Sequence, residues 1–379
     1  MDVGDAVIID GTGLDALVAA LAALGHRTLG PVVRDDAIVH GEVAGTADLP
    51  AGWHDDQAPG RYRLTRGDDH ALFAWAVGPA SWKSEFFPAR EELWRATDGP
   101  DGPVVEELPA DRAPVAIIGA RPCELASLAV LDRVLADGAV PDAGYVTRRR
   151  DAFVVVAECG TPAATCFCTS MGTGPSASAG YDLALTELPS PEGHRLLVRA
   201  GTDRGAEVLG GLPHRPADDG ERAERRAVLD GAVAGMDRVL DTDGLQGLLA
   251  RNLDHPRWEE VAERCLACGN CTLVCPTCFC SDVDDTSDLA GTVSRQRTWS
   301  SCFDRDHSFI HGGPVRPDTR SAYRQWLTHK LSTWWDQFDT SGCVGCGRCI
   351  AWCPVGIDLT EEAAAIRATD GAVAGGARA

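Results

Sequence analysis

The sequence predicts a chain of class α+β, in which an N-terminal α/β domain with a parallel β–α–β unit precedes an α-helical domain. Two continuous apolar runs in the middle of the chain, residues 114–120 and 152–158, flank a segment with helical periodicity. From residue 203 onward the sequence is charged and mostly helix-periodic. Near its end, one cysteine pattern occurs in two full copies. The apolar content of 44% is ample for a core in each part.

The first elements follow from hydrophobic periodicity. Leu14, Leu17 and Leu21 recur at helical spacing, which predicts a helix over residues 13–25. Short apolar runs predict strands over residues 28–33, 37–43 and 70–77.

Residues 11–16 (GTGLDA) have the GxGxxA pattern of a dinucleotide-binding turn, after a short strand over residues 6–10. That first strand is minimal, and Gly30-Pro31 interrupts the presumed second strand, which a central parallel strand would not tolerate. We therefore favour the alternative of a turn that leads into an ordinary helix, with Thr12 as its N-cap.

The middle of the chain predicts a right-handed parallel β–α–β unit. The runs PVAIIGA and AFVVVAE read as buried strands, and Pro122 opens the helix between them. Parallel sheets place functional residues just past the carboxyl ends of their strands. Cys123 follows the first strand, and residues 159–168 follow the second. We therefore expect Cys123 and this cysteine-containing loop to lie towards one edge of the sheet.

Two more strands are predicted at residues 181–187 and 195–199, and residues 210–220 have the composition of a linker. The predicted organisation is an α/β domain with a cysteine-rich loop over residues 1–215, a helical connector over 216–254, a two-cluster domain over 255–365 and a disordered tail over 366–379.

The pattern Cys-x2-Cys-x2-Cys-x3-Cys-Pro near the end of the chain has the spacing by which a two-cluster ferredoxin holds two [4Fe–4S] clusters. Three cysteines of each copy bind one cluster, and the fourth, next to proline, binds the other. The predicted ligands are Cys265, Cys268, Cys271 and Cys353 for cluster 1, and Cys343, Cys346, Cys349 and Cys275 for cluster 2.

Zinc and disulfides are the alternatives. A zinc site needs four ligands, usually as two CxxC pairs, which explains neither the middle cysteine nor the Cys-Pro of each copy. Cysteines this dense in a chain without a signal peptide favour metal ligation over disulfides. The residues between the two copies exceed what a minimal ferredoxin needs, and residues 318–338 among them are helix-like and rich in tryptophan. We therefore predict an α-helical ferredoxin domain, in which helices carry the cluster loops.

The remaining cysteines include two copies of Thr-Cys-Phe-Cys, at residues 165–168 and 277–280. Their likeness suggests that the two domains meet there. One interpretation is a third iron–sulfur cluster at that interface, and the other is that these are small buried apolar residues. For Cys123 the packing interpretation is preferred, because this residue lies at the start of a helix that packs against the sheet. Candidate ligands for the third cluster are Cys159, Cys166, Cys168, Cys278, Cys280 and Cys302.

Charge and hydropathy exclude some classes of partner. The formal net charge of −21 disfavours nucleic acid and anionic lipid. No stretch approaches about 20 uninterrupted apolar residues, so no membrane span is predicted. The N-terminus is acidic and short of apolar residues, unlike a secretory signal. A cytoplasmic location is expected.

Several stretches together resemble the beta subunits of soluble NAD(P)-linked nickel–iron hydrogenases (sulfhydrogenases) and the related A chain of anaerobic sulfite reductases. Thr-Cys-Phe-Cys in both domains, combined with His329-Lys330, is the most specific part of the resemblance. One departure is Glu124, where aspartate would be expected. The matching stretches are 78–90 (GPASWKSEFFPAR), 119–125 (GARPCEL), 165–175 (TCFCTSMGTGP), 265–280, 299–303, 326–330 (WLTHK) and 342–358.

The resemblance implies a non-catalytic electron-transfer subunit of a hydrogenase complex. Its expected partners are an FAD- and NAD(P)-binding flavoprotein subunit and the small and large subunits of a nickel–iron hydrogenase. It does not separate this reading from an anaerobic sulfite reductase. A self-contained flavin- or nucleotide-dependent oxidoreductase and a scaffold held together by its clusters are further alternatives.

Overall fold

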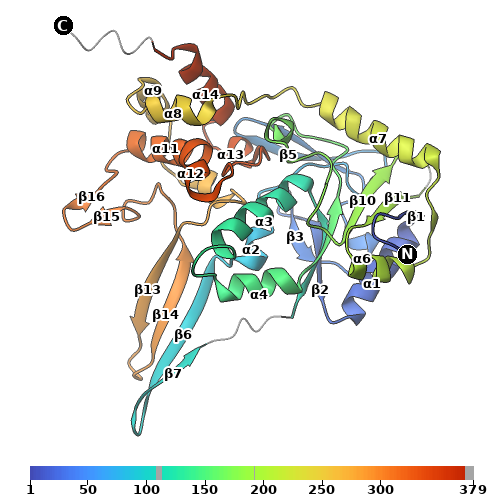
Figure 1. Cartoon of the computed structure of the whole chain (residues 1–379), viewed down its shortest axis with the longest axis horizontal. Coiled ribbons are helices and arrows are strands. Elements are labelled where there is room, and N and C mark those ends of the chain that lie inside the picture. Colours follow the sequence, from blue (N-terminus) through green and yellow to red (C-terminus); the bar gives the residue numbers. More distant parts are fainter. Residues whose placement is uncertain (108–112, 192, 372–379) are drawn as a thin grey trace.

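The computed structural model describes residues 1–107, 113–191 and 193–371. Its centre is a mixed eight-stranded sheet with strand order β12-β1-β11-β10-β9-β8-β2-β3 (Figure 1). Neighbours among β10, β9, β8 and β2 run parallel, and the outer strands pair antiparallel. The strands are β1 (Ala6–Ile9), β2 (Arg27–Arg34), β3 (Ala37–Glu42), β8 (Val115–Ala120), β9 (Phe153–Ala157), β10 (Leu183–Leu188), β11 (Arg195–Ala200) and β12 (Arg215–Pro216).

Two apolar layers explain why the central strands are hydrophobic along their whole length. Every residue of β8 and β9 is buried. Phe153 and Val155 pack in one core with α1 (Gly11–Ala23) and α6 (Asp203–Gly210), while Val154 and Val156 pack in the other with α3 (Pro122–Leu135). The parallel sheet is thus covered on both faces, as the apolar runs predicted. Also on this second face lie α2 (Lys83–Phe86) and α4 (Ala143–Asp151).

β2 agrees with the strand predicted over residues 28–33, but three other local predictions for the N-terminal part were wrong. Asp10, not Thr12, caps α1, because its carboxylate accepts a hydrogen bond of 2.9 Å from the Gly13 N–H. β2 runs through Gly30-Pro31, because its parallel pairing with β8 ends at Leu29 and Pro31 faces only the antiparallel neighbour β3. Residues 70–77 form no strand. The nearby hairpin consists of β4 (Trp53–Ala58) and β5 (Arg61–Arg66).

A second sheet joins distant parts of the chain, and nothing in the sequence predicted it. Its order is β13-β14-β6-β7, and it projects from the body of the molecule (Figure 1). The pairing of β14 with β6 links the segment between the two cysteine runs to the α/β part. The strands are β6 (Arg90–Gly99), β7 (Gly102–Glu107), β13 (Ser281–Ser287) and β14 (Val293–Trp299).

Short helices build the C-terminal part around one apolar core that includes Trp258, Tyr323 and Trp326. The predicted helix over residues 318–338 is continuous, but its middle turn is π-helical. The helices are α7 (Asp219–Ala234), α8 (Leu245–Arg251), α9 (Arg257–Ala262), α10 (Asn270–Leu273), α11 (Thr319–Thr328), η2 (His329–Thr333), α12 (Trp334–Phe338), α13 (Arg348–Ala351) and α14 (Leu359–Ala368).

At the end of the chain, α14 extends into the predicted tail, and residues 372–379 of that tail lie outside the described residues.

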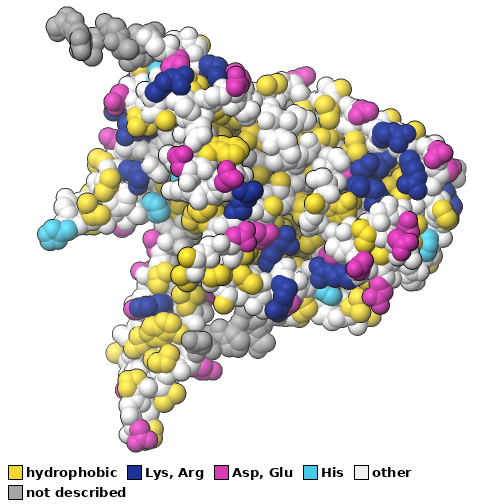
Figure 2. Space-filling model, viewed as in Figure 1, with side chains coloured by type: hydrophobic (Ala, Val, Ile, Leu, Met, Phe, Trp, Pro, Cys, Tyr) yellow, Lys and Arg dark blue, Asp and Glu magenta, His cyan; other side chains and the backbone are white. Residues whose placement is uncertain are grey.

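On the surface, acidic and basic side chains are interspersed over the face in Figure 2. The projecting sheet exposes apolar side chains of Val104, Val105 and Val283. Among the described residues, none of the helices combines the length and the apolar character that a membrane crossing requires.

Candidate metal centres

Cys265, Cys268 and Cys271 of the first run and Cys349 and Cys353 of the second run line one cavity. Its wall is otherwise mainly apolar, with Phe303, Tyr323 and Trp326 on it. The second run thus contributes two thiols to this wall, and Cys353 lies with the three cysteines to which the crossed assignment of cluster 1 joins it. Thiols gathered in an apolar setting fit a [4Fe–4S] cluster.

The loop that carries Cys265, Cys268 and Cys271 contains residues in the left-handed backbone conformation. Ala267 and Gly269 have φ of +50° and +73°, and α10 begins directly afterwards. Main-chain N–H groups point at the sulfurs: Ala267 donates to Cys265 Sγ at 3.4 Å, and Ile357 donates to Cys353 Sγ at 3.3 Å. Such donors stabilise thiolate charge and thereby raise the reduction potential of a bound cluster.

Cys275 lies with the second run rather than with its own. Burial raises the pKa of the Cys349 thiol well above its ordinary value, and the nearby thiols of Cys343, Cys346 and Cys275 raise it further. Cys353 lies with the first run and Cys275 lies near the second, as the crossed assignment expects, whereas Cys349 adjoins both groups. Their ligation of clusters stays a prediction.

Lys330 is a buried ammonium at the second group. Its Nζ donates to Cys275 Sγ at 3.2 Å, to Thr277 Oγ1 at 3.0 Å and to the Gly342 carbonyl at 2.9 Å, and the residue is only 3% exposed. The contact with Cys278 and the Lys330 charge hold the pKa of the Cys275 thiol well below its ordinary value. This role of Lys330 was missed from the sequence, where His329-Lys330 served only as a family signature.

A second buried lysine lies nearby. Lys83 Nζ donates to the Cys278 carbonyl at 2.9 Å and sits 3.7 Å from the centroid of the Trp299 ring. Burial lowers the pKa of Lys83, while Cys278 and Cys275 oppose that shift.

The six cysteines named for a third cluster do not form one group. Cys159, Cys166 and Cys168 line a cavity beside the second run, together with Cys123. Cys278 contacts Cys275 instead, and Cys280 lies near Cys302. The two Thr-Cys-Phe-Cys stretches thus serve separate places, although both adjoin the ferredoxin loops. Within the described residues, no group of three or more His, Cys, Asp or Glu side chains is placed to hold a single metal ion.

A buried ion pair fixes the second run against the α/β part. Arg348, which is 1% exposed, pairs with Glu124 and donates to the carbonyls of Gly78 and Ala80 at 2.9 Å each. Glu124 also accepts from the Arg121 N–H at 3.0 Å and so closes a capping box at the start of α3. The one departure from the family pattern is therefore a residue of this interface.

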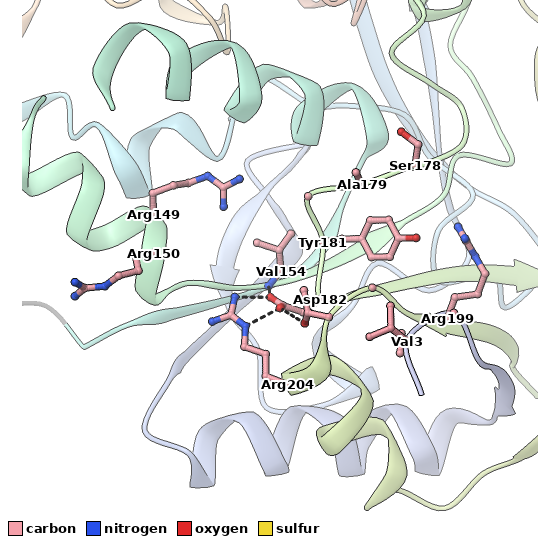
Figure 3. Close-up of a pocket in the computed structure, with 15 residues that line it drawn as sticks. Val3, Arg149, Arg150, Val154, Ser178, Ala179, Tyr181, Asp182, Arg199 and Arg204 are labelled. Carbon is pink, nitrogen blue, oxygen red and sulfur yellow. Dashed lines mark hydrogen bonds and ion pairs between the residues drawn. The ribbon is translucent and has the colours of Figure 1, made fainter. Parts of the chain in front are cut away.

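Another pocket is of a different kind (Figure 3). No cysteine lines it. Arg204 reaches Asp182 at 2.6 and 2.7 Å, and Arg199 reaches Glu158 at 2.9 Å. Both guanidinium groups are engaged in ion pairs: Arg204 joins α6 to the residue before β10, and Arg199 joins β11 to the residue after β9.

Cysteine groups carried on short helices are typical of an iron–sulfur protein. In agreement, residues 264–357 match the family model described as a 4Fe-4S dicluster domain. The chain is 34% identical over 245 residues to sulfhydrogenase 2 subunit beta of Pyrococcus furiosus, an alignment that covers 64% of this chain and 71% of that protein. The chain therefore belongs to the sulfhydrogenase beta-subunit family, which confirms the resemblance found in the sequence. No solved structure matches it.

Proposed function

We propose that this chain relays electrons through two [4Fe–4S] clusters within a soluble NAD(P)-linked nickel–iron hydrogenase. It connects the small and large hydrogenase subunits to a flavoprotein subunit that binds FAD and NAD(P), in the cytoplasm. The observation that carries the proposal is the exchange of the fourth cysteine between two runs inside the matched dicluster domain. The relative's name, which identifies a sulfhydrogenase subunit, supports this choice of complex.

The chain's own residues have three tasks in this function. The cysteine quartets hold the clusters, which supply one-electron transfer at potentials set by their surroundings. Backbone donors at Ala267 and Ile357 and the Lys330 ammonium act on the sulfurs. Aromatic side chains such as Trp326 restrict water at cluster 1. We also propose the predicted domain boundaries, 1–215, 216–254 and 255–365. Docking to partner subunits and electron transfer are then carried out by different domains.

Deletion of the gene for this chain tests the proposal. NAD(P)-coupled hydrogen turnover should be lost, while hydrogen oxidation with an artificial dye persists, because the dye takes electrons upstream of this subunit. A native complex that contains sirohaem and no nickel would replace the hydrogenase with a sulfite reductase. A monomer that reduces NAD(P) unaided would refute the relay.

A further inference from the structure

Four cysteines outside the two ferredoxin runs line one cavity. Cys123 opens α3, and Cys159 follows β9. Cys166 and Cys168 flank the start of α5 (Cys168–Met171). Three separate segments therefore deliver thiols to the carboxyl end of the parallel strands, where such sheets place functional groups.

Cys166 and Cys168 both line this cavity. The backbone between them is not extended, since Phe167 has φ −146° and ψ 30° and Cys168 already begins α5. Both thiols belong to one buried cluster with Cys123 and Cys346, while the intervening Phe167 packs into the helical core. Cys123, Cys166 and Cys168 are each no more than 8% exposed.

The cavity has mainly apolar walls and one buried cation, Arg121, whose Nη1 and Nη2 atoms donate to four main-chain carbonyls. Ala76, Val77 and Met236 line it, and Cys168 Sγ lies 3.7 Å from Met236 Sδ. Arg121 also lines it and is 1% exposed. Its Nη2 donates to the Phe73 carbonyl at 2.8 Å, yet its buried Nε has no partner. A buried guanidinium beside four thiols calls for a negatively charged group in the cavity.

The second ferredoxin run forms part of the same wall. A Cβ on Gly345 would lie 2.6 Å from the Phe167 carbonyl oxygen, and one on Gly347 would lie 2.4 Å from that of Thr165. The Phe167 N–H donates to Gly345 O at 2.9 Å. Cys346 lines the cavity as well, so this site adjoins the second cysteine group directly.

We propose that Cys123, Cys159, Cys166 and Cys168 hold a third [4Fe–4S] cluster next to cluster 2, and that Cys278, Cys280 and Cys302 do not belong to it. The site offers four thiols, an apolar enclosure and a compensating cation, which is the chemistry that a cluster of net negative charge requires. This inference rests on the proposed function, because it adds a cluster to an electron-transfer subunit.

Anaerobic reconstitution of the full chain tests the site by counting iron and sulfide and by Mössbauer and EPR spectroscopy. The unsubstituted chain should bind about twelve iron atoms. Cys159→Ser and Cys168→Ser should each lower the count to about eight while the EPR signals of both ferredoxin clusters persist. The matched control Cys302→Ser removes a half-buried thiol that lies outside the proposed site, and this variant should retain about twelve iron atoms.

The outcomes separate the two proposals. About eight iron atoms in the unsubstituted chain, unchanged by Cys159→Ser, would overturn the third cluster and leave the proposed function standing. Loss of four iron atoms with Cys302→Ser but not with Cys159→Ser would also overturn it, because the site would then belong to the other cysteine group. Zinc without sulfide would overturn the proposed function itself.

Discussion

Substitution of individual cysteines tests whether the fourth cysteine of each run binds the cluster of the other run. Cys353 belongs to the second run but lines the cavity of the first. Cys353→Ser and Cys265→Ser should therefore perturb the same EPR signal of the reduced protein, because both would alter cluster 1. Cys343→Ser is the control and should alter the other signal. A Cys353→Ser spectrum that matches Cys343→Ser would show that the runs do not cross.

Lys330 is expected to set the potential of the cluster that Cys275 binds. Its ammonium donates to the sulfur, so it stabilises the added negative charge of the reduced state. Lys330→Met should lower the midpoint potential by about 60 mV or more, which corresponds to a tenfold change for one electron. EPR-monitored redox titration measures the shift, and Lys330→Arg should restore part of it. Unchanged potentials in Lys330→Met would assign the lysine to packing alone.

His40 gives the fold a dependence on pH. It stacks on Trp82 with ring centroids 3.5 Å apart, and burial lowers the pKa of His40 to about 4. The unfolded chain, with a pKa of about 6.5, takes up the proton first as the pH falls, so stability is lost progressively between about pH 6.5 and 4. Between pH 7.5 and 5.5 the free energy of unfolding should fall by about 1 kcal/mol more than in His40→Phe.

Anaerobic urea titrations at the two pH values measure this difference. Equal losses in both proteins would show that His40 titrates normally in the folded state.

At the scale of elements, the contact between the second cysteine loop and residues 165–168 depends on two glycines. Gly345 has φ +66°, and a Cβ there would collide with the backbone of Phe167 and Cys168. Gly345→Ala should therefore reduce the free energy of unfolding by about 2 kcal/mol or more, from left-handed strain and the clash combined. Gly312→Ala is the control, because nothing lies within 4 Å of its Cβ position. Thermal unfolding of both variants with equal effects would refute the close contact.

The elements also show what the sequence could and could not predict. The strands β8 and β9 could be predicted from local pattern, because a run of consecutive apolar residues indicates burial on both faces of a sheet. The crossed cysteine runs were likewise predicted from the spacing of residues that lie close together in the sequence. The hairpin β13–β14 could not be predicted, because its strands are polar and largely exposed, and its partner β6 lies far away in the sequence. The lysines at the cysteines could not be placed either, since only the tertiary fold brings Lys83 and Lys330 to Cys275 and Cys278.

At the scale of the whole molecule, the proposed domains share a sheet. β14 lies between β13 of the C-terminal part and β6 of the α/β part. A chain that ends at residue 254 would leave β6 as an open edge, and open edges associate. We expect that fragment to elute from size-exclusion columns as oligomers, whereas the full chain without partners elutes as a monomer. A monomeric, folded fragment would show that the α/β part is autonomous.

The shared sheet also orders events during biosynthesis. The β6–β7 hairpin leaves the ribosome long before its partner β14, and the loop of residues 165–168 long before the glycines that press on it. The chain therefore passes through a state in which its cysteine loops face the cytosol and the two halves are apart. Most of the cysteines are partly or fully buried in the folded chain, so iron and sulfide should reach them faster in that interval than after the two halves have closed.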